Sequence, residues 1–349
     1  MPESLTRSPT EAIPARTTTP RVICVTPARN EAWILERFLS AAELWADHVI
    51  VADQQSTDQT VAIAKQFDKV RVVTNRGGEY DEGKRQQLLL AAAREFPGPR
   101  VIVALDADEF LSPSWDSVEW QQALQSSPGT VLAFDWVNIL PDGTHAWIPP
   151  QKIPYGFVDD GSDHAGERIH ATRIPVHDHS PIFNLSETRV LHFQYTDWPR
   201  MKSKQRWYQC WERVNHPQKR PIQIYRQYHR MDAFPPDQVH QIPPTWIPYY
   251  AERGVDLRPH ASAGPFWWDD DVVDWLRAHG TERFRRLDIW DIDWAAVATE
   301  LGRTVSRGEL GDPTTSVDRA VLKFLRATQK VSQLWPVRLL QRLLSVIGW

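Results

Sequence analysis

Two aspartates that are separated by one alanine, Asp106 and Asp108, directly follow the apolar run Val101–Leu105. A short continuous apolar run of this kind predicts a strand that is buried on both faces of a sheet. Ligands of open α/β sheets bind beyond the carboxyl ends of the strands. Two carboxylates at such a strand end are suited to one hard cation, Mg²⁺ or Mn²⁺, and to the diphosphate that the cation bridges. We therefore predict a metal-assisted site for a nucleoside diphosphate.

Two further polar motifs follow apolar strands. The motif Thr-Pro-Ala-Arg-Asn-Glu ends at Glu31, after the expected strand Val22–Thr26, and the motif Asp-Gln-Gln-Ser-Thr-Asp begins at Asp53, after His48–Ala52. The carboxyl ends of parallel strands meet at one edge of a sheet. Both motifs are therefore expected beside the paired aspartates.

These motifs require a frame of alternating strands and helices, and the chain has that alternation up to about residue 140. Such alternation predicts right-handed crossovers and a mainly parallel sheet, which together define an α/β fold. The expected strands are Val22–Thr26, His48–Ala52, Val70–Thr74, Val101–Leu105 and Thr130–Val137, and the expected helices are Glu31–Leu44, Asp58–Phe67, Glu82–Glu95 and Ser114–Gln125.

The periodicity weakens after Leu140. Residues 141–166 are rich in proline, glycine and aspartate, and we expect them to form a long loop. Residues 216–265 show no clear period. The strands expected in this half are Glu167–Ile174 and Thr188–Phe193, and the helices are Met201–Val214, Asp269–Ala278, Asp293–Leu301 and Asp318–Gly348, the last with a break at Pro336.

The order of the motifs resembles that of the family 2 glycosyltransferases, which have the GT-A fold. In that family the first strand typically ends in Pro-x-x-Asn-Glu, the second in Asp-Asp-Gly-Ser-x-Asp and the fourth in Asp-x-Asp. The corresponding segments here begin at Pro27, Asp53 and Asp106. The resemblance covers about residues 21–200. It implies a nucleotide-binding, mostly parallel sheet that is flanked by helices and followed by a helical, aromatic-rich C-terminal extension.

The expected domain plan follows from this resemblance and from composition. Residues 1–20 are rich in proline, threonine and serine, and we expect a disordered tail. The GT-A domain would occupy residues 21–200. A helical and irregular extension would follow over residues 201–317, and a basic amphipathic terminal helix over residues 318–349.

The resemblance implies a role for each motif. The first motif would line the nucleotide pocket, Asp53 would accept a hydrogen bond from the base, usually a uracil N–H, and the paired aspartates would bind the metal, Asp106 alternatively the ribose. Lys84 and Arg85 match a region where the family places basic or polar residues near the diphosphate, although surface helices also carry such pairs. The residues expected to bind the nucleotide are Pro27, Arg29, Glu31, Asp53, Lys84, Arg85 and Asp106.

One motif departs from the family pattern. The usual Asp-Asp-Gly-Ser is replaced by Asp-Gln-Gln-Ser, so Gln54 stands in place of the second acid and Gln55 in place of the glycine. Asp53 is retained, which favours nucleotide binding. The departure leaves the geometry of the turn and the choice of base open.

Sugar transfer with inversion needs a general base that deprotonates the acceptor hydroxyl. The resemblance implies an acid after the fifth strand, often in a Glu-Asp pair, and no such pair stands there. The candidates are acids of the acceptor-side loop, namely Asp159, Asp160, Asp163 and Glu167. Asp163 and Glu167 both lead into Arg168–Ile174, which resembles a strand of the lipopolysaccharide core glucosyltransferases, and Glu167 is preferred. A solvated acidic loop is the alternative.

His192 ends a short apolar strand and precedes a helix that carries Lys202 and Lys204. The resemblance implies that a histidine in this region is the third metal ligand, beside Asp106 and Asp108. A hydrogen-bonded histidine of the core is the alternative. For Lys202, Lys204 and Arg206 of this helix we expect either contact with phosphate or a place on a charged helix face.

Composition limits the classes of partner and compartment. The net charge of −4 and the pI near 6.3 argue against a nucleic-acid-binding protein. Two cysteines, Cys24 and Cys210, fit a reducing cytoplasm rather than a disulfide framework. No apolar stretch approaches the length of a membrane span, and the N-terminus lacks the apolar core of a signal peptide. We expect a cytoplasmic protein.

The C-terminal tail is basic. Residues 319–349 contain arginines and lysines but no acid, and after Pro336 the polar and apolar residues separate onto two faces of a helix, with Trp335 and Trp349 at its ends. Such a helix is typical of proteins that bind the interface of an anionic membrane. Packing against the domain or a second subunit is the alternative. Peripheral contact with the inner face of a membrane would suit a lipid-linked acceptor.

The sequence therefore favours a metal-dependent, inverting glycosyltransferase. It would move a sugar from a nucleotide-diphosphate sugar, with a UDP-sugar preferred, to a glycan or lipid-linked acceptor of the cell envelope. A nucleotidyltransferase would need a glycine-rich basic loop after the first strand, and a dinucleotide oxidoreductase a G-x-G-x-x-G motif, and neither is present. A catalytically inactive GT-A-like binding or scaffold protein stays open, because the Glu-Asp pair is missing.

Overall fold

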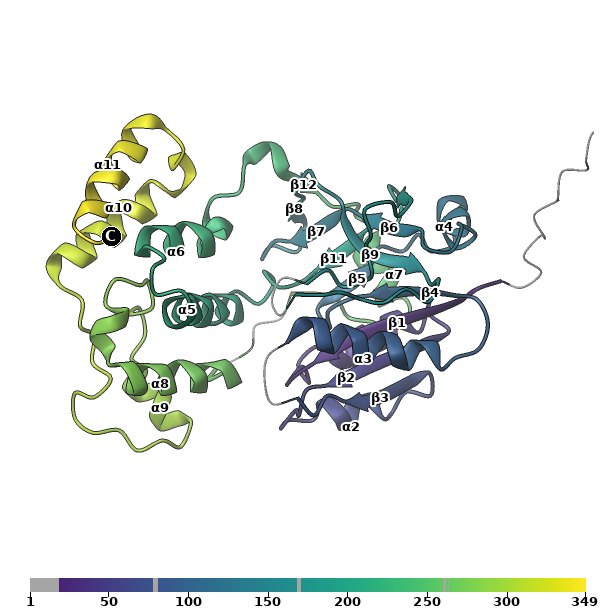
Figure 1. Cartoon of the computed structure of the whole chain (residues 1–349), viewed down its shortest axis with the longest axis horizontal. Helices are drawn as coiled ribbons and strands as arrows, with labels where there is room; N and C mark the ends of the chain where they lie inside the picture. The colour runs from purple at the N-terminus through teal and green to yellow at the C-terminus, as the bar shows by residue number, and fades with distance from the viewer. Residues whose placement is uncertain (1–18, 78–80, 168–170, 260–261, 263) are drawn as a thin grey trace, which may run out of the picture.

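The structure is a computed structural model that describes residues 19–77, 81–167, 171–259, 262 and 264–349. Figure 1 shows an elongated molecule with an α/β part on the right and a helical part on the left, where the chain ends. The tail expected over residues 1–20 lies almost wholly outside the described residues.

The larger sheet has seven strands in the order β10-β6-β9-β4-β1-β2-β3. Strand β1 pairs in parallel with β2 and β4, and β2 pairs in parallel with β3. Strand β9 runs antiparallel to β4 and β6. The strands are β1 (Arg21–Ala28), β2 (His48–Asp53), β3 (Val70–Thr74), β4 (Arg100–Ala104), β6 (Val131–Phe134), β9 (Ile153–Val158) and β10 (Ile182–Asn184).

Alternation along β1 explains why this sheet is buried on both faces. Cys24 points to one face, where it packs with helix α1 (Leu35–Ala42), and Ile23 points to the other, where it packs with helix α3 (Glu82–Arg94). Helices α2 (Thr60–Ala64), α4 (Val118–Leu124) and α7 (Trp246–Ala251) complete the α/β part, and Tyr250 of α7 lies in its core. The mostly parallel sheet flanked by helices that the sequence predicts is therefore confirmed.

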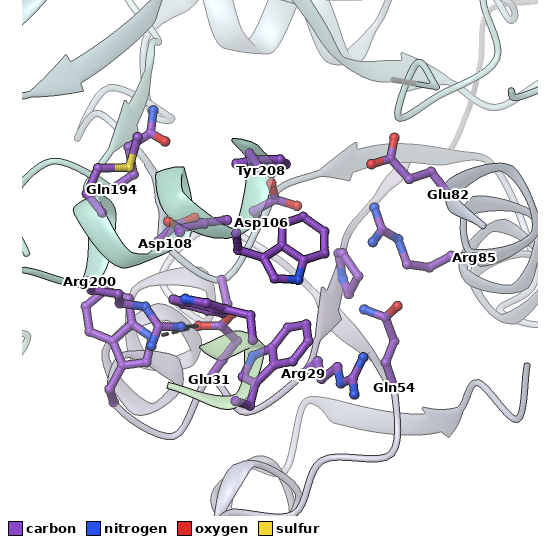
Figure 2. Close-up of a pocket in the computed structure, with 18 residues that line it drawn as sticks. Arg29, Glu31, Gln54, Glu82, Arg85, Asp106, Asp108, Gln194, Arg200 and Tyr208 are labelled. Carbon is purple, nitrogen blue, oxygen red and sulfur yellow. Dashed lines mark hydrogen bonds and ion pairs between the residues drawn. The ribbon is translucent and has the colours of Figure 1, made fainter. Parts of the chain in front are cut away.

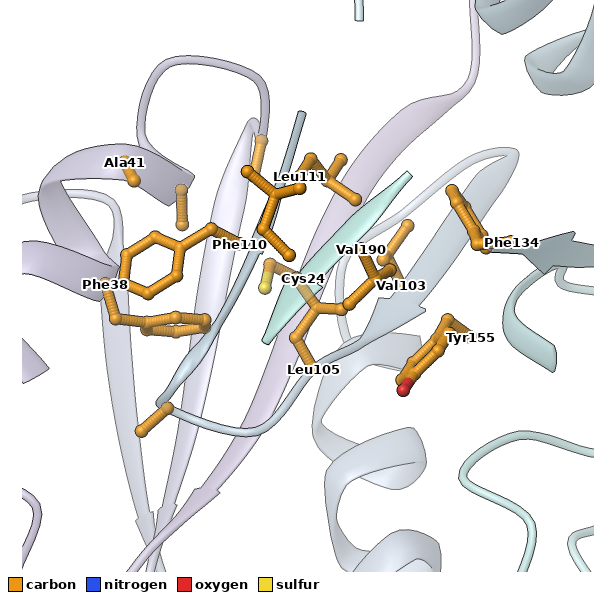
Figure 3. Packing of buried hydrophobic residues seen from close by; sticks show 14 of the residues in the cluster. Cys24, Phe38, Ala41, Val103, Leu105, Phe110, Leu111, Phe134, Tyr155 and Val190 are labelled. Carbon is orange, nitrogen blue, oxygen red and sulfur yellow. The ribbon is translucent and has the colours of Figure 1, made fainter. Parts of the chain in front are cut away.

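A smaller sheet begins directly after the paired aspartates. Its five strands have the order β12-β8-β7-β11-β5. Figure 3 shows Phe110 and Leu111 of β5 with Val190 of β11, packed against Cys24 and Leu105 at the strands of the larger sheet. The strands are β5 (Glu109–Leu111), β7 (Trp136–Ile139), β8 (His145–Trp147), β11 (Val190–His192) and β12 (Val239–Gln241).

Three expectations about this region are wrong. The strand expected over Thr130–Val137 is divided into β6 and β7, which belong to different sheets. The loop expected over residues 141–166 contains β8 and β9. The described residues of Glu167–Ile174, where a strand is expected, are not in a strand.

Glycine permits the close approach of β9 to β4. A Cβ on Gly156 would lie 3.2 Å from the carbonyl oxygen of Ile102.

The helical part follows β11. Its main core joins α5, α6, α8 and α9 around buried residues such as Cys210, Val272 and Trp294. Pro336 lies in the first turn of α11, so it begins this helix instead of breaking a longer one. No helix among the described residues is long and apolar enough to cross a bilayer. The helices of this part are α5 (Trp198–Asn215), α6 (Pro221–Tyr228), α8 (Trp267–His279), α9 (Trp294–Glu300), α10 (Ser316–Ala327) and α11 (Trp335–Val346).

The start of α3 lies against another backbone segment. The amide of Gly83 donates to the carbonyl oxygen of Glu167 at 3.2 Å. A Cβ added at Gly83 would collide with the carbonyl oxygen of Gly166. This contact fixes the first turn of α3 against the end of the segment that follows β9.

We expect Gly83→Ala to destabilise the protein, although alanine normally stabilises a helix by about 1 kcal/mol relative to glycine. The two backbones would have to separate, at a cost on the order of 1–3 kcal/mol in the free energy of unfolding. The matched control is Lys84→Ala, because the Lys84 side chain is 78% exposed. The control should stay within about 0.5 kcal/mol of wild type in denaturant unfolding. Stabilisation by Gly83→Ala would contradict the close contact.

Candidate active site

A cleft of about 210 Å³ lies where the carboxyl ends of β1 and β4 meet α5 and α8 (Figure 2). Its wall also includes the residue after β2 and the first turn of α3. Equal numbers of acidic and basic side chains line the cleft. This charge balance is needed because charged groups that are shielded from water are destabilising unless they are paired. The charged residues of the cleft are Glu31, Glu82, Asp106, Asp108, Arg29, Arg85, Arg200 and Lys204.

The carboxylate of Asp108 is held in its ionised form. Its Oδ2 lies 3.5 Å from Nε2 of His192. Burial by itself raises the pKa of Asp108, but the charges of His192 and Lys204 and the hydrogen bond from His192 outweigh burial, and the pKa lies well below its usual range. An ionised carboxylate in a cleft is a suitable ligand for a cation.

The surroundings of His192 determine which ring nitrogen faces Asp108. The amide nitrogen of buried Asn138 donates to two backbone carbonyl oxygens at 3.4 Å, so its Oδ1 faces Nδ1 of His192 at 3.0 Å. Nδ1 therefore carries a proton, and Nε2 faces the carboxylate. A nitrogen lone pair beside a carboxylate needs a proton or a metal cation between them. The pair Asp108 and His192 therefore fits a divalent cation.

Asp106, the other predicted metal ligand, is engaged differently. Its Oδ2 accepts a hydrogen bond from Nη2 of Arg173 at 2.8 Å. Within the described residues, no three His, Cys, Asp or Glu side chains form a group that could hold a metal ion. Asp108 and His192 would hold the cation, and the predicted set of three that includes Asp106 stays a prediction.

Arg173 is held by a buried network behind the paired aspartates. Fully buried Glu109 accepts hydrogen bonds from Arg173, from the Tyr155 hydroxyl at 3.0 Å and from the Asp106 amide at 2.8 Å. Burial opposes the charge of Arg173, but the Asp106 and Glu109 carboxylates raise its pKa well above the usual value. The network therefore fixes the turn that carries both aspartates.

Helix α5 supplies the cations on the other side of the cleft. Arg200 and Lys204 are four residues apart and share one face of the helix with Tyr208. Burial opposes the charge of Lys204, but Tyr208, Asp108 and Glu31 raise its pKa. Lys204 therefore stays charged inside the cleft.

Glu31 joins the end of β1 to the helical part. Its Oε2 accepts a hydrogen bond from Nη2 of Arg200 at 3.1 Å, which Figure 2 shows as a dashed line. Burial raises the pKa of Glu31 to about 7, although the charge of Arg200 opposes this shift. The carboxyl group therefore changes its charge close to neutral pH.

Aromatic rings cover one wall of the cleft. The guanidinium of Arg29 lies 3.9 Å from the centre of the Trp267 ring, and that of Arg200 lies 4.7 Å from the Trp268 ring. These contacts hold the two cations by cation–π attraction. Flat ring faces in a polar cleft suit the apolar faces of sugars and the planes of nucleobases.

The motifs after β1 and β2 are linked through two strained turns. Asn30 and Gln55 have positive φ angles of 55° and 59°, a conformation that costs non-glycine residues about 1–2 kcal/mol. The Asn30 side chain accepts from the Thr57 amide at 2.7 Å, and the Asn30 amide donates to the Ser56 hydroxyl at 3.0 Å. Gln55 thus keeps the left-handed turn in which the related motif has glycine.

The structure places most of the predicted nucleotide-binding residues at the cleft. Pro27, Arg29, Glu31, Arg85 and Asp106 line it.

Two predicted nucleotide-binding residues are placed elsewhere. Buried Asp53 does not line the cleft, and its Oδ1 accepts from the Ser56 amide at 3.1 Å, although its neighbour Gln54 is in the wall. Lys84 points to solvent and lies 3.6 Å from Asp81. Their predicted roles stay predictions.

The acids predicted as general bases lie outside the cleft wall. Asp159 is buried and forms ion pairs with Arg94 and Arg100. Asp160, Asp163 and Glu167 are exposed, and none of the four acids lines the cleft. Asp160 Oδ1 accepts from the Ser162 amide at 2.9 Å. The backbone carbonyl oxygen of Glu167 accepts a hydrogen bond from the Gly83 amide at the start of α3. The same turn of α3 contributes Glu82 and Arg85 to the cleft wall. Of the three exposed acids, Glu167 therefore lies against an element of the cleft.

Several cleft residues escape prediction from sequence. Arg200, Trp267 and Trp268 line the cleft but belong to segments without a recognised motif. The spacing of Arg200, Lys204 and Tyr208 at four-residue intervals is a signal that could identify one face of α5. Arg206, in contrast, pairs with Asp291 at 2.7 Å, away from the cleft.

Solved structures that are similar to this chain have low scores. A mannosyltransferase from Pyrobaculum calidifontis in complex with GDP-mannose and Mn²⁺ is 15% identical, with a TM-score of 0.33 over 95% of this chain and 91% of that chain. Glucosyl-3-phosphoglycerate synthase from Mycobacterium tuberculosis in complex with Mn²⁺ and UDP is 22% identical, with a TM-score of 0.25 over 34% of this chain and 44% of that chain. These TM-scores are too low to carry a functional argument.

Three further findings limit what the similarities mean. A 4-diphosphocytidyl-2C-methyl-D-erythritol synthase is 18% identical, with a TM-score of 0.30 over 41% of this chain and 76% of that chain. The chain spans less than half the length of the mycobacterial structures that it matches. No curated protein sequence matches the chain.

A family model gives the firmer result. Residues 23–139, about a third of the chain, match the model described as glycosyl transferase family 2. The matched segment holds β1 to β4 and the turns that carry Glu31, Asp106 and Asp108. The chain therefore carries a family 2 glycosyltransferase domain.

Proposed function

We propose that the protein transfers a sugar from a nucleotide-diphosphate sugar, preferably a UDP-sugar, to a hydroxyl group of a glycan or lipid-linked acceptor of the cell envelope. One observation carries the proposal: the carboxylate of Asp108, which lies 3.5 Å from His192, lines the same cleft as the half-buried ammonium group of Lys204. A divalent cation and a diphosphate need these two kinds of group side by side.

The residues of the cleft divide between the parts of the donor. Asp108 and His192 would hold Mg²⁺ or Mn²⁺, which neutralises charge on the leaving diphosphate when bound. Lys204 and Arg200 would contact the phosphate oxygens. Arg29 and the Trp267 ring would lie beside the base or the sugar. Asp53 would accept a hydrogen bond from the base.

The reaction forms one bond and breaks one. The acceptor hydroxyl oxygen attacks the anomeric carbon from the face opposite the diphosphate, so the configuration inverts. The bond between that carbon and the diphosphate oxygen breaks, and the nucleoside diphosphate leaves with the bonding electrons. The hydroxyl proton passes to a general base. Among the acids predicted for this role we favour Glu167, because it is bonded to the first turn of α3. The relation to lipopolysaccharide core glucosyltransferases stays a prediction.

We expect turnover of a nucleotide-sugar donor panel, measured as release of nucleoside diphosphate, to depend on Asp108 and on a divalent cation. Asp108→Asn removes the ionised ligand and should lower kcat at least about a hundredfold, and chelation of the cation should have a similar effect on wild type. Asp116→Asn is the control, because Asp116 is exposed and does not line the cleft. If wild type turns over no donor, the domain is an inactive scaffold. Nucleotide transfer, with release of pyrophosphate, would indicate a nucleotidyltransferase.

Lys204→Gln should weaken the binding of UDP or GDP about 10- to 100-fold, because a charge-assisted hydrogen bond contributes about 1.5–3 kcal/mol. Lys202→Gln is a matched control on the same helix, since Lys202 is exposed and does not line the cleft. The measurement is calorimetric titration in the presence of Mn²⁺. Equal affinities of the two variants would contradict the phosphate-binding role of Lys204.

Glu167→Gln should lower kcat about 10²- to 10⁴-fold and leave the nucleotide affinity unchanged, as expected for loss of a general base. Asp163→Asn is the control from the same exposed loop. Steady-state kinetics with a turned-over donor and acceptor separates the two effects. Near-normal kcat in Glu167→Gln would exclude this residue as the base.

A further inference from the structure

Helices α10 and α11 form the end of the molecule that lies farthest from the sheets, at the upper left of Figure 1. This end carries most of the exposed apolar side chains. Of the thirteen large hydrophobic residues that are exposed in the described chain, nine lie within residues 317–347. Scattered exposed hydrophobics are ordinary, but a concentration on one small region marks an interaction surface.

The outer face of α11 is an apolar stripe. Trp335, Leu339, Leu343 and Val346 are spaced by four, four and three residues, so they share one face of the helix. Their exposed fractions are 76%, 49%, 58% and 83%. The opposite face packs inward through Val337, which is 8% exposed. The helix thus anchors one face in the protein and presents a second apolar face to solvent.

A groove between α10 and α11 extends this stripe. Its volume is about 550 Å³, and its walls include Phe324 of α10, Leu340 of α11 and Ile347, the residue after α11. The stripe residue Leu343 also lines the groove, so the two features form one continuous surface. We name the stripe and the groove together the C-terminal apolar surface.

The charge of this region is opposite to that of the rest of the chain. Residues 316–349 contain six arginines and lysines and one acid, a net charge of +5, whereas the whole chain has −4 and the remainder therefore −9. The single acid, Asp318, is buried beside Arg285 and caps α10. Arg338 and Arg342 lie next to the stripe, and neither has an ion-pair partner among the described residues.

We propose that the C-terminal apolar surface docks on an anionic lipid bilayer, with the stripe in the interfacial region and the arginines at the lipid head groups. An apolar helix face edged with arginine and bearing tryptophan at its end has this chemistry. Helix α11 has twelve residues and a length of about 18 Å, which is too short to span a bilayer but suits a helix that lies in its plane. A second copy of the chain fits worse, because two surfaces of charge +5 would face each other. The inference does not depend on the proposed sugar transfer.

The test is flotation of the full chain with phosphatidylcholine vesicles, with and without phosphatidylglycerol. Wild type should bind the vesicles that contain phosphatidylglycerol, and high salt should weaken this binding. Leu339→Ser combined with Val346→Ser should reduce partitioning at least tenfold. Arg338→Gln combined with Arg342→Gln should reduce it on the anionic vesicles by a similar factor. Val118→Ser on α4 is the matched control, since Val118 is 73% exposed outside this surface.

Each outcome decides the proposal. Failure of wild type to float with anionic vesicles would overturn it, as would equal binding by the stripe variant. If the stripe variant instead changes the oligomeric state in light scattering and wild type ignores vesicles, the occupant is a second copy. Melting temperatures close to wild type would show that the variants remain folded, as expected for substitutions of exposed residues.

Discussion

Charge compensation within one cleft is the constraint on which the arrangement of this protein depends. Acidic side chains that come close together out of water need cations beside them, because an unpaired buried charge is strongly destabilising. The sheet supplies Asp106 and Asp108, but two of the compensating cations, Arg200 and Lys204, come from α5 in the helical part. The charge balance of the cleft therefore requires both the α/β part and the helical part. The ion pair between Glu31 of the α/β part and Arg200 of the helical part joins the two directly.

Charge compensation also explains how the cleft could bind a cation and a diphosphate without a rearrangement of its side chains. Arg173 and Glu109 secure the turn of the paired aspartates from behind, and Asn138 orients His192 from the side. A divalent cation beside Asp108 would add positive charge, and a diphosphate beside Lys204 would add negative charge. The balance of the cleft is thus preserved when both bind, which is the electrostatic logic of metal-assisted diphosphate sites.

Much of the fold could be predicted from sequence, but unevenly. Strand β3 begins and ends where its apolar run does, and β1, β2 and β4 differ by one or two residues at their ends. Strand β9 escapes prediction because Pro154 and Gly156 interrupt its apolar pattern, although the glycine is what permits its close pairing with β4. In the smaller sheet, β11 lies within the strand expected over Thr188–Phe193. Strands β5, β8 and β12 have three residues each, too few for a period to be recognised.

The site could be predicted where a motif marks it and not where folding brings distant residues together. Strand-end motifs identify Glu31, Asp106 and Asp108, which line the cleft. Arg173 is 64 residues from Glu109 in sequence, so no local pattern links them. The substitution of glycine by Gln55 left the turn uncertain from sequence. The turn persists because hydrogen bonds from the segment after β1 hold it.

The most direct test of the central claim is whether wild-type protein binds a nucleoside diphosphate together with a divalent cation. Calorimetric titration with UDP and GDP, with and without Mn²⁺, measures this in one experiment. The account predicts saturable binding of at least one of them that strengthens at least tenfold when Mn²⁺ is present, because the cation would link Asp108 to the phosphates. Absence of binding under both conditions, or equal affinity with and without the cation, would contradict it.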